Sequence, residues 1–115
     1  MQNIPESLVE QARALEDGTC TANDLARHAL EKATARTDLN AFVALDADKV
    51  LGQATASDER RARNELRGPI DGLPIAVKDN YLTRDYPTTA CSNALPSEPA
   101  GVDATIVANL RAAGA

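Results

Sequence analysis

Most of the chain carries apolar residues at helical spacing, and one short stretch carries them consecutively. Recurrence at three- and four-residue intervals predicts helices over residues 3–17, 21–36, 46–66 and 102–113. In the second of these, six apolar residues follow the helical template without a miss: Ala22, Leu25, Ala26, Ala29, Leu30 and Ala33. The consecutive stretch runs from Leu73 to Val77. Because both of its faces are apolar, it predicts a buried strand.

Residues at the ends of the first two predicted helices support their boundaries. Asn3 or Ser7 is suited to cap the first helix, and Gly18 to end it. Thr21 and Asp24 have the spacing of a capping box at the start of the second. These signals define where two helices start and where the first one stops.

The later elements are predicted from fewer signals. Phe42, the only phenylalanine, is expected to pin the link over residues 38–45 to the core. The third helix is expected to turn these residues inward: Val50, Leu51, Ala54, Ala62 and Leu66. For the last helix, the cap is predicted at Asp103, the stop at Gly114, and the inward face at Ile106, Val107, Leu110 and Ala113.

The predicted strand is followed directly by a lysine, Lys78. Pro74 suits the start of a strand, where its missing N–H does least harm. Lys78 emerges at the carboxyl end, where open α/β sheets place their ligands. Two interpretations stay open: a functional lysine, or one that pairs with Asp79 or extends to water. The residues by themselves favour the second.

One strand cannot make a sheet, because its backbone N–H and C=O groups need partners on both edges. Only the weak candidates Tyr81-Leu82 and residues 41–45 could supply another strand. The expected fold class is therefore α/β, incomplete in this chain, with amino-terminal helices and the first buried strand of a larger domain. The expected division is a helical region over residues 1–67 and a strand, loop and helix over residues 68–115.

Residues 80–97 are rich in Thr, Ser, Asn and Pro, which predicts a loop. Within it, Thr88-Thr89-Ala90-Cys91-Ser92 is a run of small residues that could line a polar pocket. Ordinary turn chemistry explains the same run, and from the sequence it is the preferred interpretation.

Charge narrows the possible partners. The 115 residues have a formal net charge of −5 and a pI of about 4.7, so binding to nucleic acid or to an anionic membrane is disfavoured. The arginines near residues 60–67 are interleaved with acids, which is typical of a solvated helix face. There is no long apolar run and no export signal, so a cytoplasmic location is expected.

No cofactor or metal site is predicted. His28, the only histidine, falls on the polar face of its helix and is expected to be solvated. The two cysteines, Cys20 and Cys91, are too few for a structural zinc site and are expected to be small packed side chains.

Three motifs together resemble the opening of the amidase signature family. They are Gly68-Pro69-x-x-Gly72-x-Pro74-Ile75-x-Val77-Lys78-Asp79, then Thr88-Thr89-x-x-Ser92, then Asp103-Ala104-x-x-Val107-x-x-Leu110-Arg111-x-Ala113-Gly114-Ala115. Leu39-Asn40-Ala41-Phe42 is similar to that family's amino-terminal linker, so the resemblance runs from about residue 19 to the end. It implies a mixed β-sheet covered by helices.

The resemblance implies chemistry for one residue. The family uses a Ser–cis-Ser–Lys triad, and Lys78 matches its lysine. Burial at a strand end would disfavour the charged form of the lysine and suit it to accept a proton. Both triad serines belong to a Gly/Ser-rich stretch that is absent here, and the serines present, Ser7, Ser57, Ser92 and Ser97, lack a nucleophile context. Asp85 and Cys91 depart from residues common in the family, which leaves substrate preference open.

Three functional hypotheses follow. The first is the amino-terminal part of an amidase that converts a small carboxamide to carboxylate and ammonia, inactive by itself. The second is the A subunit of a tRNA-dependent amidotransferase, which works with partner subunits. The third is a non-catalytic helical module, either standing alone or as a truncation product. The first two share Lys78 as the catalytic residue and require no cofactor.

Overall fold

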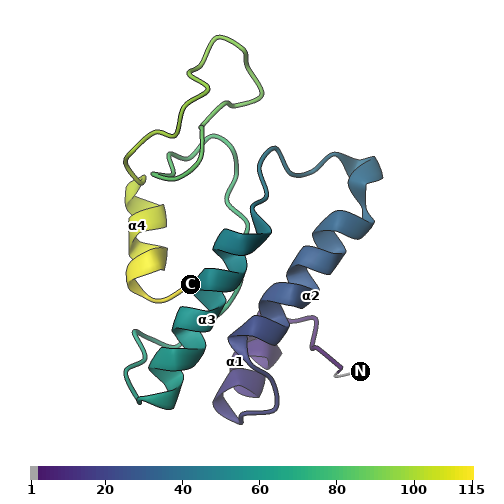
Figure 1. Ribbon diagram of the computed structural model, residues 1–115, viewed down its shortest axis with the longest axis vertical. Helices are drawn as coiled ribbons and strands as arrows, with labels where there is room; N and C mark the ends of the chain where they lie inside the picture. The colour runs from purple at the N-terminus through teal and green to yellow at the C-terminus, as the bar shows by residue number, and fades with distance from the viewer. Residues whose placement is uncertain (1–2) are drawn as a thin grey trace. The chain divides into compact units, whose positions relative to one another are not determined.

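The computed structural model describes residues 3–115 and divides into two compact units (Figure 1). Met1–Pro74 together with Ala113–Ala115 forms the first unit, and Ile75–Ala112 forms the second. The first contains α1 (Leu8–Glu16), α2 (Ala22–Ala35), the 3₁₀ helix η1 (Thr37–Leu39) and α3 (Ala47–Ala62); the second contains α4 (Thr105–Ala112). No helix in the described residues is long and apolar enough to cross a membrane.

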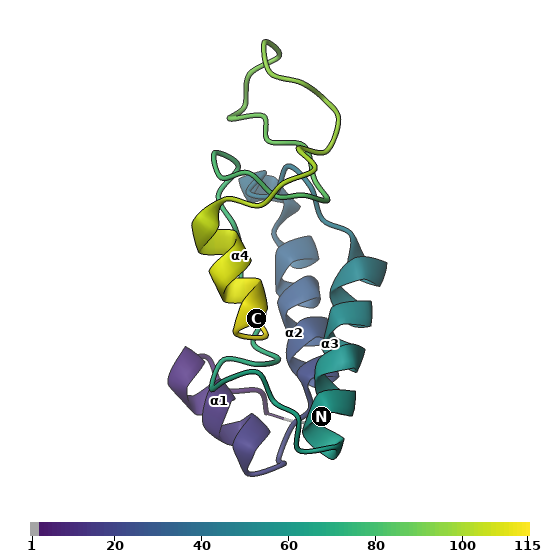
Figure 2. The same cartoon turned by 90° about the vertical axis from the view of Figure 1, so that its left-hand side faces the viewer.

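The core of the first unit lies where α2 packs along α3. The two helices run side by side in opposite directions in both views (Figures 1 and 2). Small residues allow this close approach: Ala22 and Ala26 of α2 and Ala54 of α3 are all buried. The rest of the buried cluster is Ala14, Leu15, Cys20, Leu25 and Leu73.

The start of α2 is fixed from its own sequence and from α3. Thr21 and Asp24 form the predicted capping box. In addition, the Asp58 carboxylate on α3 accepts hydrogen bonds from the N–H groups of Ala22, at 2.7 Å, and Asn23, at 3.1 Å. A carboxylate at a helix N-terminus satisfies unpaired N–H groups and complements the helix dipole. Asp58 therefore ties the two helices together at a defined register.

Two predicted helices are shorter than expected. α1 begins at Leu8 with Ser7 as its cap, so residues 3–6 precede the helix. α3 ends at Ala62, because Asn64 adopts a left-handed conformation with φ of 57°. Leu66 therefore lies beyond the helix and is 42 % exposed, and Ala62 is exposed as well, so the prediction that both face inward is wrong.

Phe42 is also placed differently from the prediction. It is 45 % exposed, and so is not pinned into the core. Its neighbours in the link, Leu39 and Val43, are 59 % and 61 % exposed. The link therefore leaves several apolar side chains open to solvent.

The predicted strand over residues 73–77 is absent. Leu73 is buried, but residues 73–78 have no regular secondary structure, and Ile75 and Val77 are 45 % and 39 % exposed. The only β-type pairing in the described residues is an isolated bridge between Thr83 and Tyr86. A strand forms only with hydrogen-bonded neighbours, and no other described segment offers an edge to this one. The sheet inferred from the sequence is thus not formed within residues 3–115, whose regular secondary structure is helical.

α4 is shorter than predicted. It begins at Thr105, and Asp103, the residue predicted to cap it, accepts a hydrogen bond from the Arg84 N–H at 2.8 Å. Val107 is buried as expected, but Ile106 is 52 % exposed. Gly114 follows the helix with φ of 95°, which is the predicted left-handed stop.

Candidate active site around Lys78

The segment that leads to Lys78 is anchored in the first unit by a buried carboxylate. Asp71 has no exposed side-chain surface. It accepts hydrogen bonds from Ser57 Oγ at 2.6 Å, from Arg60 Nη2 at 2.7 Å and Nε at 3.0 Å, and from the Arg67 N–H at 2.9 Å. Its carbonyl oxygen accepts a further bond from Arg61 at 3.2 Å. The Asp-Gly turn is thus held against α3.

These contacts determine the charge state of Asp71. Burial by itself would raise the pKa of the carboxyl group, but the hydrogen bonds from Arg60, Ser57 and the Arg67 N–H, with the Arg60 charge, lower it to about 2. Asp71 therefore remains a carboxylate at neutral pH, and it is paired rather than isolated.

Two glycines allow the backbone to approach the Asp71 carboxylate and its hydrogen-bond donor Ser57 closely. Gly72 donates its N–H to the Gly114 carbonyl at 2.9 Å, which joins the entry of the segment to residues 113–115. A Cβ on Gly72 would lie 2.7 Å from Ser57 Oγ, and one on Gly114 would lie 2.7 Å from Asp71 Oδ2. Both glycines have positive φ, of 92° and 95°. Any other residue at either position would displace Ser57 or the Asp71 side chain.

Lys78 lies in the second unit, four residues after the boundary at Pro74. Its side chain is exposed, so the desolvation expected at a buried strand end is not provided by the described residues. Its ammonium group has no ion pair within residues 3–115. Its carbonyl oxygen accepts the Tyr81 N–H at 3.1 Å, which starts a turn immediately after the lysine.

The carboxylate of Asp79, the residue after Lys78, is hydrogen-bonded to Thr89. Asp79 accepts hydrogen bonds from the Thr89 N–H, at 2.9 Å, and from the Thr89 hydroxyl. The side-chain bond from Thr89, and then its backbone bond, lower the pKa of Asp79. The ion pair between Lys78 and Asp79 that the sequence leaves open is therefore not formed.

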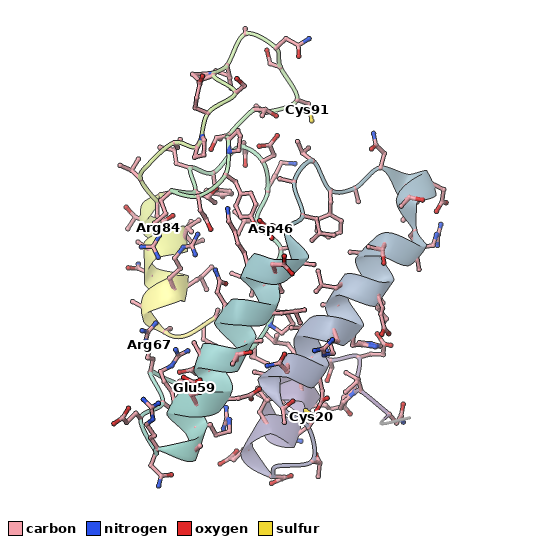
Figure 3. All side chains as sticks on the ribbon, in the orientation of Figure 1. Cys20, Asp46, Glu59, Arg67, Arg84 and Cys91 are labelled. Atoms are coloured by element: carbon pink, nitrogen blue, oxygen red, sulfur yellow. The ribbon has the colours of Figure 1, made fainter. Side chains whose placement is uncertain are left out.

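The Thr-Thr-Ala-Cys-Ser run forms a tight turn. Ala90 and Cys91 both have left-handed φ, 46° and 57°, and the Ser92 N–H donates to the Thr89 carbonyl at 2.8 Å. The Ser92 hydroxyl accepts the Ala94 N–H at 3.2 Å, so it has a turn-forming role. Cys91 is an exposed free thiol on this loop (Figure 3).

Charged residues close the base of the loop beside α4. Arg111 lies 2.7 Å from Asp85 and 3.0 Å from Asp103, and Arg84 approaches Asp103 at 4.0 Å. Figure 3 shows Arg84 near the start of α4 and Cys91 farther along the loop. Asp85, noted above as a departure from the family pattern, is thus one partner in a set of ion pairs.

The sequence does not reveal the roles of Asp71, Arg60 and Thr89. A solvated face is predicted for Arg60, yet its side chain is only 18 % exposed. Its spacing from the inward residue Ala54 and from Ser57, at three-residue intervals, is a signal that it shares their face. Asp71 followed by glycine resembles a surface turn, and nothing local distinguishes a buried Asp-Gly turn from an exposed one.

Comparisons with known proteins agree with the motifs. Residues 24–115 match the family described as Amidase. The A subunit of the glutamyl-tRNA(Gln) amidotransferase from Burkholderia thailandensis is 47 % identical over 109 residues, which cover 95 % of this chain and 22 % of that protein. The chain therefore spans about a fifth of the length of this relative.

Solved structures give the same result. A crystal structure of an amidase superposes with a TM-score of 0.82 at 38 % identity, covering 96 % of this chain and 25 % of that one. An inhibitor-bound complex, described as vestigial and as revealing the origins of an s-triazine catabolic enzyme, superposes with a TM-score of 0.87 at 35 % identity, covering 95 % and 24 %. With the match over residues 24–115, these likenesses establish that the chain belongs to the amidase signature family.

Proposed function

We propose that the chain supplies the lysine-bearing, amino-terminal part of an enzyme that hydrolyses a small carboxamide to carboxylate and ammonia. The observation that carries this proposal is the Lys78 motif, which lies inside the match to the amidase family over residues 24–115. In this proposal Lys78 is the catalytic lysine of a Ser–cis-Ser–Lys triad. No cofactor takes part, and the cytoplasmic location expected from the sequence stays a prediction.

The neutral amine of Lys78 would accept a proton through the bridging serine while the nucleophilic serine attacks the amide carbon. The same proton would then pass to the departing ammonia. Within the chain, Ser7 caps α1, Ser57 donates to Asp71, Ser92 supports a turn, and Ser97 is exposed on the loop. We therefore assign both triad serines to sequence outside these 115 residues, and expect the chain to be inactive by itself.

The exposed apolar residues beside Lys78 support the same assignment. Ile75 and Val77 are 45 % and 39 % exposed and precede the lysine directly. Pairing of residues 73–77 in a sheet would bury both and remove water from the lysine, which favours its neutral form. The domain division of residues 1–67 and 68–115 remains part of this proposal.

A chimera tests the role of Lys78. Residues 24–115 replace the matching part of the Burkholderia thailandensis protein, which is assembled with the other subunits of that enzyme and assayed for ammonia release. Lys78→Ala is expected to lower kcat by at least about 10³-fold, because the proton acceptor is lost. The control is Lys49→Ala on α3, whose side chain is 45 % exposed, and it is expected to leave kcat unchanged. Turnover by Lys78→Ala close to that of the parent chimera would sink the assignment.

The second candidate is the A subunit of a tRNA-dependent amidotransferase. The 47 % identity to such a protein, against 38 % to the amidase of known structure, favours it. It would release ammonia from glutamine and depend on partner subunits. The protein that carries this chain would then hydrolyse glutamine only when partners are added. Hydrolysis of simple amides without any partner would favour the first candidate instead.

A further inference from the structure

The contact between Asp79 and Thr89 separates a carboxylate from the lysine that precedes it. A carboxylate directly after a lysine is a natural ion-pair partner for its ammonium group. In the structure, Thr89 instead donates both its N–H, at 2.9 Å, and its hydroxyl to Asp79. The Lys78 ammonium has no ion pair in the part of the chain described.

The orientation of the Thr89 hydroxyl is fixed by a second bond. Its oxygen accepts the Cys91 N–H at 3.1 Å, so its own hydrogen is directed to Asp79. The main chain repeats the connection, because the Ala90 N–H donates to the Asp79 carbonyl at 2.8 Å. The two left-handed residues, Ala90 and Cys91, form the tight turn that brings these donors together.

Four other charged side chains of the second unit pair with one another, and Glu98 is exposed and forms no ion pair within the described residues. Arg84, Asp85, Asp103 and Arg111 form ion pairs among themselves at the base of the loop. The Thr89 bonds lower the pKa of Asp79, so it is ionised at neutral pH. If Thr89 released it, Asp79 would be a charged neighbour able to pair with Lys78.

We propose that Thr89 is a positioning residue that holds Asp79 away from Lys78, and so keeps the lysine available as a base. This inference rests on the proposed amidase function. Thr89 does not touch the substrate in this proposal, and it acts only through Asp79. Loss of its hydroxyl would allow Asp79 to stabilise the ammonium form, which cannot accept a proton.

The test uses Thr89→Val, which keeps the shape and removes the hydroxyl, in the chimera described above. We expect kcat at neutral pH to fall about tenfold and the acidic limb of the pH–rate profile to move up by about one pH unit. KM is expected to stay within about twofold, because substrate contacts are unchanged. Thr89→Ser, which keeps a hydroxyl, should have the kcat and the acidic limb of the parent chimera. The matched control is Thr88→Val, because the Thr88 hydroxyl donates to the Tyr81 carbonyl at 3.3 Å and not to Asp79.

A double variant distinguishes release of a charge from a general loss of structure. Asp79→Asn added to Thr89→Val removes the competing charge, and is expected to return the acidic limb to its original position. A limb that stays shifted in the double variant, or a Thr89→Val profile equal to the parent's, would overturn the inference while leaving Lys78 as the base. Full activity of Lys78→Ala would overturn the proposed function, and this inference with it.

Discussion

Asp71 and Arg60 face each other through two hydrogen bonds, with Arg60 Nη2 at 2.7 Å from Asp71 Oδ1 and Arg60 Nε at 3.0 Å from Oδ2. The pair joins the last turn of α3 to the Asp71-Gly72 turn, which precedes Lys78 in the chain. Asp71 is fully buried and Arg60 is partly buried. Loss of either partner would leave an uncompensated charge in the interior.

Asp71→Asn is therefore expected to destabilise the chain by about 3 kcal/mol. The substitution removes the negative charge that pairs with Arg60 and one of the two carboxylate oxygens that accept its hydrogen bonds. Urea unfolding of the 115-residue chain, followed by circular dichroism, measures the change. The control is Asp38→Asn, which breaks the exposed pair with Arg36 and should destabilise the chain much less. Equal effects of the two substitutions would contradict a buried anchor.

The stability of the chain is expected to depend on acid through Asp71. Its pKa is about 2 in the folded chain against an ordinary value of 3.8, so its contribution is complete above about pH 4 and is lost as pH falls toward 2. The difference corresponds to about 2 kcal/mol. Unfolding free energies measured between pH 2 and pH 5 should fall more steeply for the parent than for Asp71→Asn. Parallel curves would show that another group causes the loss.

Asp58→Ala is expected to cost about 1–2 kcal/mol, since the first N–H groups of α2 lose a charged cap supplied by α3. The neighbouring Glu59→Ala provides the comparison. Glu59 forms only an exposed pair with Arg63 at 3.8 Å, and its loss should change the unfolding free energy by about 0.5 kcal/mol or less. A smaller effect for Asp58 than for Glu59 would argue against the cap.

Gly114→Ala is expected to destabilise by more than about 2 kcal/mol, because a Cβ there would overlap the Asp71 carboxylate at a φ of 95°. Gly18→Ala is the control that separates the two causes of this destabilisation, the steric overlap of the Cβ and the positive φ of the backbone. Gly18 also has positive φ, 70°, but a Cβ there meets nothing within 4 Å, so it should cost only about 1 kcal/mol. Thermal or urea unfolding of both variants gives the comparison.

Local signals in the sequence predict the helices well where a cap is encoded nearby. Thr21 and Asp24 fix the start of α2, and Gly114 the end of α4. The end of α3 is harder to predict because Asn64, which adopts the left-handed conformation, is a weaker signal than glycine. The strand is predicted from a property of the segment alone, whereas a strand exists only with neighbours that the described residues do not provide.

The candidate site is predictable only in part. The motif draws attention to Lys78, but the partners of Asp71 and Asp79 depend on tertiary contacts. Arg60 contributes from 11 positions before Asp71, and Thr89 from 10 positions after Asp79. Spacing rules within one helix or strand cannot find such pairs, because the turns between them determine the distance.

The hydrogen bond between Gly72 and Gly114 has a consequence for how this family can be varied. The chain leaves the first unit just after Gly72 and returns to it just before Gly114, while Ile75–Ala112 forms a unit of its own. A segment whose two ends are held together in this way can be exchanged as a cassette, because the bond keeps its two attachment points close together. Transplanting Ile75–Ala112 between relatives would thus carry Lys78, Asp79 and Thr89 together, and leave the helical unit around Asp71 as a common scaffold.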